Sequence, residues 1–112
     1  MKRLITSCTV ALLIGGCIDT TKIAPRVIQL GIVEDVATLE RGRDVYITKC
    51  TACHNAIRVT RFSRFEWDTE ILPVMIEESS LSTNDANAIT SYIHAVLKSQ
   101  TELYSAAEST TH

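Results

Sequence analysis

Two cysteines and a histidine lie together near the middle of the chain, in the run Cys50-Thr51-Ala52-Cys53-His54. Thiols and imidazoles are side chains that carry redox, metal-binding and covalent chemistry. Two thiols at this spacing can form a reversible dithiol pair, can bind a metal, or can form two covalent bonds to one ligand. The context of the run favours one of these three uses.

The spacing is that of covalent haem attachment. In the pattern C-x-x-C-H, Cys50 and Cys53 form thioethers with two vinyl groups on one porphyrin edge, and His54 ligates the iron. A thioredoxin-like pair would need a βαβ context, which the sequence does not show. A structural zinc site needs four ligands, whereas this run supplies three, two of them adjacent. The sequence therefore predicts one covalent haem c.

The N-terminal residues predict export, which this kind of haem attachment requires. Lys2 and Arg3 make a basic start, residues 4–14 are mostly apolar, and Gly15 and Gly16 are small. These are the three parts of a secretory signal. The apolar run is far shorter than the roughly 20 residues of a bilayer-spanning helix. We therefore expect residues 1–16 to be a signal peptide.

The expected cleavage site resembles the lipobox of bacterial lipoproteins, in which the cysteine after the cleaved bond carries lipid. Here Ile14-Gly15-Gly16 precedes Cys17. The resemblance implies that Cys17 is lipidated and anchors the protein to the periplasmic side of a membrane, inner or outer. Secretion with an unmodified Cys17 is the alternative.

Charge and composition narrow the classes of function. Without Lys2 and Arg3 the chain keeps nine Lys and Arg against 13 Asp and Glu, a formal charge of −4. That balance argues against nucleic acid as a partner, because phosphate contacts need clustered basic residues. The sequence shows no acid–base pair, nucleophile or phosphate loop, so we do not expect an independent enzyme.

Helical patterns begin after a segment without sustained periodicity, residues 17–35, which we expect to be a tether. The domain is expected over residues 36–99. Its first helix is predicted over residues 39–49 with Thr38 as the N-cap. Gly42 lies on the apolar face of that helix and costs about 1 kcal/mol relative to alanine. The presence of a glycine at this position is explained if the backbone of another segment packs closely against it.

Two further helices are predicted downstream. The run Ser63-Arg64-Phe65-Glu66 is a capping box that begins the second helix. Pro73 predicts a kink or an end just before Val74, which would free Met75 to turn inward.

The last helix is predicted to start at the N-cap Ser82. Residues 100–112 form a small, polar tail that is expected to fray. Because no strand pattern is present, the predicted fold class is all-α. The apolar stripe of the last helix comprises Ala86, Ile89, Ile93, Val96 and Leu97.

Residues 38–98 resemble the small single-haem cytochrome c family. The matching features are Gly42 and Tyr46 before the C-x-x-C-H run, a lone methionine after it, and a final helix with the aromatic Tyr92. The resemblance implies a small helical domain wrapped around one haem. It also implies that the first and last helices cross at right angles, with Gly42 packed on Tyr92.

The resemblance further implies that Met75 is the sixth iron ligand, and a thioether there would raise the reduction potential. Met75 follows His54 by 21 residues, a shorter loop than the family usually has. A flexible core residue is the alternative role for Met75, and His94 is a rival ligand. If neither binds, a five-coordinate iron would be open to small gases.

Basic and aromatic residues follow the haem motif. Arg58, Arg61 and Arg64 recur every three residues and could pair with haem propionates, form a docking patch for an acidic partner, or be solvated. Trp67 is expected to pack against the haem, since aromatic side chains contribute large apolar area.

Together these features predict a lipid-anchored periplasmic protein that carries electrons between redox partner proteins. Two alternatives remain open. The chain could be a haem subunit of a periplasmic dehydrogenase or oxidase, because residues 61–67, followed shortly by Met75, look like the abbreviated haem domains beside some redox enzymes. It could also be a gas-binding haem sensor.

Overall fold

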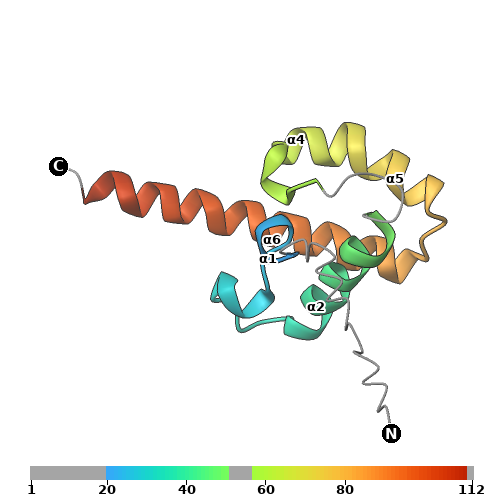
Figure 1. The fold of residues 1–112 in the computed structure, drawn as a ribbon, viewed down its shortest axis with the longest axis horizontal. Helices are drawn as coiled ribbons and strands as arrows, with labels where there is room; N and C mark the ends of the chain where they lie inside the picture. The colour runs from blue at the N-terminus through green and yellow to red at the C-terminus, as the bar shows by residue number, and fades with distance from the viewer. Residues whose placement is uncertain (1–19, 51–56, 111–112) are drawn as a thin grey trace, which may run out of the picture.

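A computed structural model of the chain describes residues 20–50 and 57–110 (Figure 1), and the regular elements in these residues are all helical. The predicted all-α fold class is therefore confirmed for the described part of the chain. None of the described helices is both long enough and apolar enough to cross a bilayer.

The elements follow one another with short connections. The first described ones are α1 (Thr20–Ile23) and the 3-10 turn η1 (Val27–Leu30), followed by α2 (Val36–Val45), which continues into the π-helical turn η2 (Tyr46–Cys50). The 3-10 turn η3 (Val59–Arg61) comes next. A continuous helical run is then made by α4 (Arg64–Glu66), the π-helical η4 (Trp67–Ile71) and α5 (Leu72–Glu78), and the last element is α6 (Thr83–Ser109).

The closest helix packing in the fold is between α2 and α6, and Gly42 lies at its centre. A β-carbon on Gly42 would lie 2.1 Å from the carbonyl oxygen of Ala88 and 2.6 Å from the β-carbon of Tyr92. Both the expected backbone approach and the Gly42–Tyr92 pairing are thus confirmed. At the same crossing, Arg41 forms an ion pair with Asp85 at 2.9 Å.

Part of the expected tether packs on the domain. Ala24 and Val27 are fully buried, and their neighbours bind the crossing helices through backbone carbonyls. The hydroxyl of Tyr92 donates to the carbonyl of Pro25 at 2.6 Å, and Arg43 Nε donates to the carbonyl of Ala24 at 3.0 Å. The apolar side chains of this segment complete the core beside α2 and α6.

Two helix boundaries differ from the sequence predictions. α2 begins at Val36, so Thr38 is inside the helix and is not its N-cap. The preceding Asp35 has a left-handed backbone, with φ of 52°, and makes no side-chain cap, which is why no capping signal marks the start. α6 continues to Ser109, because no glycine or proline interrupts residues 99–109.

The helix starts that depend on side-chain caps are confirmed. Ser63 Oγ accepts from the Glu66 N–H at 3.2 Å, and Glu66 Oε2 accepts from the Ser63 N–H at 2.7 Å. At α6, Ser82 Oγ accepts from the Asp85 N–H at 3.1 Å. These bonds satisfy N–H groups that have no partner within the helix.

The close approach at Gly42 gives a first prediction. The variant Gly42→Ala should lower the free energy of unfolding by about 1–3 kcal/mol, because the added methyl meets backbone atoms that cannot move freely. Urea denaturation followed by far-ultraviolet circular dichroism measures the change. Glu40→Ala, on the exposed side of the same helix, should change stability by no more than about 0.5 kcal/mol. Equal stability of the Gly42→Ala variant and the parent would contradict the packing.

Candidate functional site

A cavity of about 260 Å³ lies between the end of η2 and the helical run from η4 to α5. Its volume is near the lower end of the roughly 300–1,000 Å³ range of small-molecule sites. The lining is mostly aliphatic and aromatic, with two sulfur-containing side chains and two carboxylates. It consists of Tyr46, Cys50, Ile57, Phe62, Trp67, Glu70, Ile71, Val74, Met75 and Glu78.

An aromatic cluster forms one wall of the cavity. Trp67 is buried, and its indole N–H donates to the carbonyl of Val59 at 2.8 Å. The ring of Tyr46 meets Trp67 edge-on, with ring centroids 6.1 Å apart, and Phe62 does so from another side at 5.8 Å. Edge-to-face contacts at these separations are favourable. The expected burial of Trp67 is confirmed, and its neighbours hold the ring in one orientation.

The two described residues that flank residues 51–56 both line the cavity. Cys50 ends η2 and is 8% exposed, and Ile57 lies at the other side of the gap. Tyr46, one helical turn before Cys50, donates its hydroxyl hydrogen bond to the carbonyl of Ile57.

Burial changes the ionisation of Tyr46. Loss of water around the phenol raises its pKa above the ordinary value, and the neighbouring Cys50 raises it further. The phenol therefore stays protonated at neutral pH and keeps donating its hydrogen bond to the carbonyl of Ile57.

Met75 reaches the cavity from α5, within the helix. The predicted break before Val74 is wrong, because α5 runs from Leu72 to Glu78 with Pro73 in its first turn. The π-helical η4 precedes the proline, and the Leu72 N–H bonds to the Trp67 carbonyl five residues back. A widened turn of this kind accommodates the missing N–H of proline without ending the helix.

The other candidate ligand and the arginines lie elsewhere. His94 on α6 is hydrogen-bonded to Asp68, with Nε2 and Oδ1 2.6 Å apart, and it does not line the cavity. Arg64 forms an ion pair with the same carboxylate at 3.5 Å. Arg58 and Arg61 are exposed and do not line the cavity either. The structure thus brings together Cys50, Met75 and Trp67, and it separates them from His94.

The remaining predicted site residues, Cys17, Cys53 and His54, lie outside the described residues. Within the described part of the chain, no three His, Cys, Asp or Glu side chains come together as a metal site. The residues that are described fit a haem by their chemistry. A thiol and a thioether both line the cavity, and the rest of the lining is mostly apolar and aromatic.

Some residues of the site were not predicted from the sequence. Ile57, Glu70 and Glu78 line the cavity but belong to no motif. Tyr46 was expected on the apolar face of the first helix and as part of a family pattern, but not as a site residue, although its position four residues before Cys50 places both side chains on one helical face. That spacing was the available signal.

Comparison of the chain with protein-family models, with curated proteins and with solved structures finds no significant match in any of the three.

The ion pair beside His94 gives a second prediction. The hydrogen bond from His94, helped by the charges of His94 and Arg64, lowers the pKa of Asp68 against a smaller opposing effect of desolvation. A carboxylate with a lowered pKa stabilises the fold above its unfolded-state pKa of about 3.9 and loses that contribution as the pH falls through its folded-state value. Because Asp68 is on the surface, the contribution should be about 0.2–1 kcal/mol.

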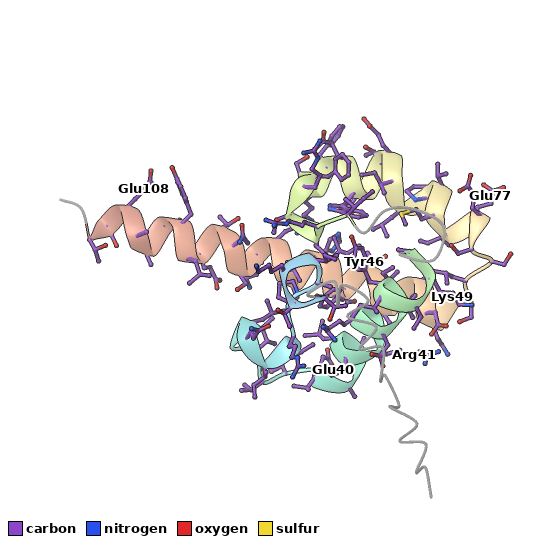
Figure 2. The ribbon with its side chains drawn as sticks, in the orientation of Figure 1. Glu40, Arg41, Tyr46, Lys49, Glu77 and Glu108 are labelled. Atoms are coloured by element: carbon purple, nitrogen blue, oxygen red, sulfur yellow. The ribbon has the colours of Figure 1, made fainter. Side chains whose placement is uncertain are left out.

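The expected result is that Asp68→Asn is less stable than the parent at pH 6 by this amount, and that the difference shrinks below pH 4. Urea denaturation across that range measures it. Glu77→Gln serves as a control, since Glu77 is exposed, lies near the end of α5 (Figure 2) and belongs to neither ion pair of Asp68. A stability difference that does not change with pH would contradict the assignment.

Proposed function

We propose that this chain is a c-type cytochrome that passes single electrons between redox proteins through one covalently bound haem. The observation that carries the proposal is that Cys50, the first residue of the C-x-x-C-H run, and Met75 line the same apolar cavity. The shared cavity supports the proposal because it brings the thioether of Met75, 25 positions later in the sequence, to the apolar surface where Cys50 would hold the porphyrin.

Each site residue has a defined role in this proposal. Cys50 and Cys53 would hold the porphyrin by thioether bonds, and His54 and Met75 would ligate the iron. The haem supplies the one-electron chemistry when it is bound. The chain would bury the apolar faces of the haem against Trp67 and Phe62, and so exclude water from the haem.

The protein would tune the reduction potential through opposing effects. A methionine ligand and an apolar surrounding raise the potential, because both disfavour the more highly charged oxidised iron. Carboxylates act in the opposite sense, and Glu70 and Glu78 lie at the cavity. The two carboxylates would therefore moderate the potential that Met75 sets.

The position of Met75 favours an electron carrier over a gas sensor. A sensor needs an open iron site, whereas a thioether at the cavity offers a sixth ligand. A haem subunit of a dehydrogenase or oxidase would use the same site with a stable partner, and co-purification of a larger enzyme would identify it.

The proposed location is the periplasm, with the protein held on a membrane by lipid on Cys17. The support comes from the sequence, where a basic start, a short apolar run and two small residues precede that cysteine. Haem attachment outside the cytoplasm and an export signal are independent features that agree.

The covalent attachment gives a third prediction. When the chain is expressed with a haem-ligation system, the mature protein should carry one haem that survives acid–acetone extraction. Cys50→Ala or Cys53→Ala should lose the two-thioether product, as measured by intact mass and by the pyridine haemochrome spectrum. Thr51→Ala, a change inside the same run, should keep it. A folded, colourless parent protein would refute the proposed function.

The axial ligand gives a fourth prediction. The variant Met75→Ala should lose the near-infrared band of methionine–iron ligation, lower the reduction potential, and gain carbon monoxide binding in the reduced state. Spectroscopy and a redox titration measure these changes. Ile76→Ala is the matched control. Ile76 is the next residue along α5, and its side chain packs on the core without lining the cavity. If Met75→Ala leaves the spectrum unchanged, Met75 is a packing residue and the iron has a different sixth ligand.

A further inference from the structure

The last turns of α6 project from the rest of the fold. The helix runs to Ser109, and its end extends well beyond the other elements (Figure 1). Every residue from 100 to 109 is exposed, and Leu103 and Tyr104 are 67% and 68% exposed. The projecting segment therefore has apolar surface that no described part of the chain covers. Isolated helices of this length are also marginal in water, so a contact that covers the segment would stabilise it.

This projecting segment is acidic. It contains Glu102 and Glu108, and residues 99–112 include no lysine or arginine. Glu108 lies near the far end of the projecting helix (Figure 2). A surface that covers the segment should therefore be basic, with an apolar part to receive Tyr104.

A groove with these properties lies at the base of the same helix. Its volume is about 550 Å³, and it lies where α6 meets η3 and the start of α4. Its basic lining residues are Arg61, Arg64 and Lys98, and its apolar ones are Phe62 and Leu97. No carboxylate lines it. Asp68 partly neutralises Arg64 from outside the groove, so Arg61 and Lys98 are its main positive charges.

The groove and the projecting segment share one face of α6. His94, Leu97, Lys98 and Thr101 line the groove and are spaced three or four residues apart. Residues at this spacing lie along one side of a helix, and the series continues to Tyr104 and Glu108. Along this side of α6, Lys98 lines the groove and Glu108 lies near the projecting end.

When two copies of α6 run antiparallel, this face of one copy is complementary in charge to the same face of the other. If two copies cross with Thr101 at a two-fold axis, Tyr104 of each copy lies near Leu97 and Lys98 of the other. Glu108 of each copy then lies near His94 and the groove arginines of the other. A two-fold interface uses the same surface patch on both copies, as this arrangement requires.

We propose that the chain forms a homodimer in which the projecting end of α6 of each copy occupies the basic groove of the other. The second copy is the occupant that the charges favour, because the projecting end of α6 contains glutamates and no lysine or arginine, whereas the groove beside the same helix is lined by Arg61, Arg64 and Lys98. The proposal does not depend on haem binding.

The test is the mass of the intact full-length protein in solution, measured by sedimentation equilibrium over a range of concentrations in density-matched non-ionic detergent. The parent should be a dimer that weakens as salt is raised. Glu108→Arg and Arg61→Glu should each weaken dimerisation by about tenfold or more, because each places like charges together at two symmetric contacts. The double variant should restore the dimer, since both reversals again pair opposite charges.

Two controls complete the design. Glu34→Arg makes the same charge change at an exposed site outside the groove and should leave dimerisation unchanged. Far-ultraviolet circular dichroism should show the same helix content in all variants, because the altered side chains are exposed. A parent that is monomeric at every concentration overturns the proposal. So does a double variant that is no more dimeric than either single variant.

Discussion

The backbones of α2 and α6 meet at Gly42, and the positions of the other elements follow from this contact. Because Gly42 has no β-carbon, the Ala88 carbonyl can lie where any other residue would place a methyl group. The contact holds the second half of α2 against α6, and α2 continues without a break into η2. Cys50 at the end of η2 is therefore placed by a contact two helical turns earlier.

The aromatic cluster connects this framework to the cavity. Tyr46 belongs to η2, Trp67 belongs to η4, and their rings meet at the cavity wall. Hydrogen bonds from both side chains reach backbone carbonyls on the segment that precedes α4. The helix that carries Met75 is thus held relative to Cys50 by buried polar bonds as well as by apolar packing. A small domain buries a limited share of its surface, so a large apolar ligand in this cavity would add to its core.

The sequence was most informative where structure depends on neighbouring residues. Ser63 and Ser82 begin helices through hydrogen bonds to residues three positions away, and such bonds are visible in the sequence. The start of α2 was missed because Asp35 makes no side-chain cap. Pro73 was misjudged because a π-helical turn precedes it. Within the site, Cys50 and Met75 were predicted, whereas Ile57 and the two cavity carboxylates were not, since only the folded chain brings them there.

The packing of Ala24 and Pro25 against α2 and α6 limits how far the domain can stand from a membrane. If Cys17 carries lipid, as proposed, only two residues separate it from Thr20, where the described helix α1 begins. Three extended residue steps span roughly 10 Å. The domain would therefore lie directly on the bilayer surface with a preferred side facing the lipid. If the protein also carries electrons, as proposed, its redox partners would meet it by lateral diffusion in two dimensions, and those on the same membrane would have an advantage over soluble ones.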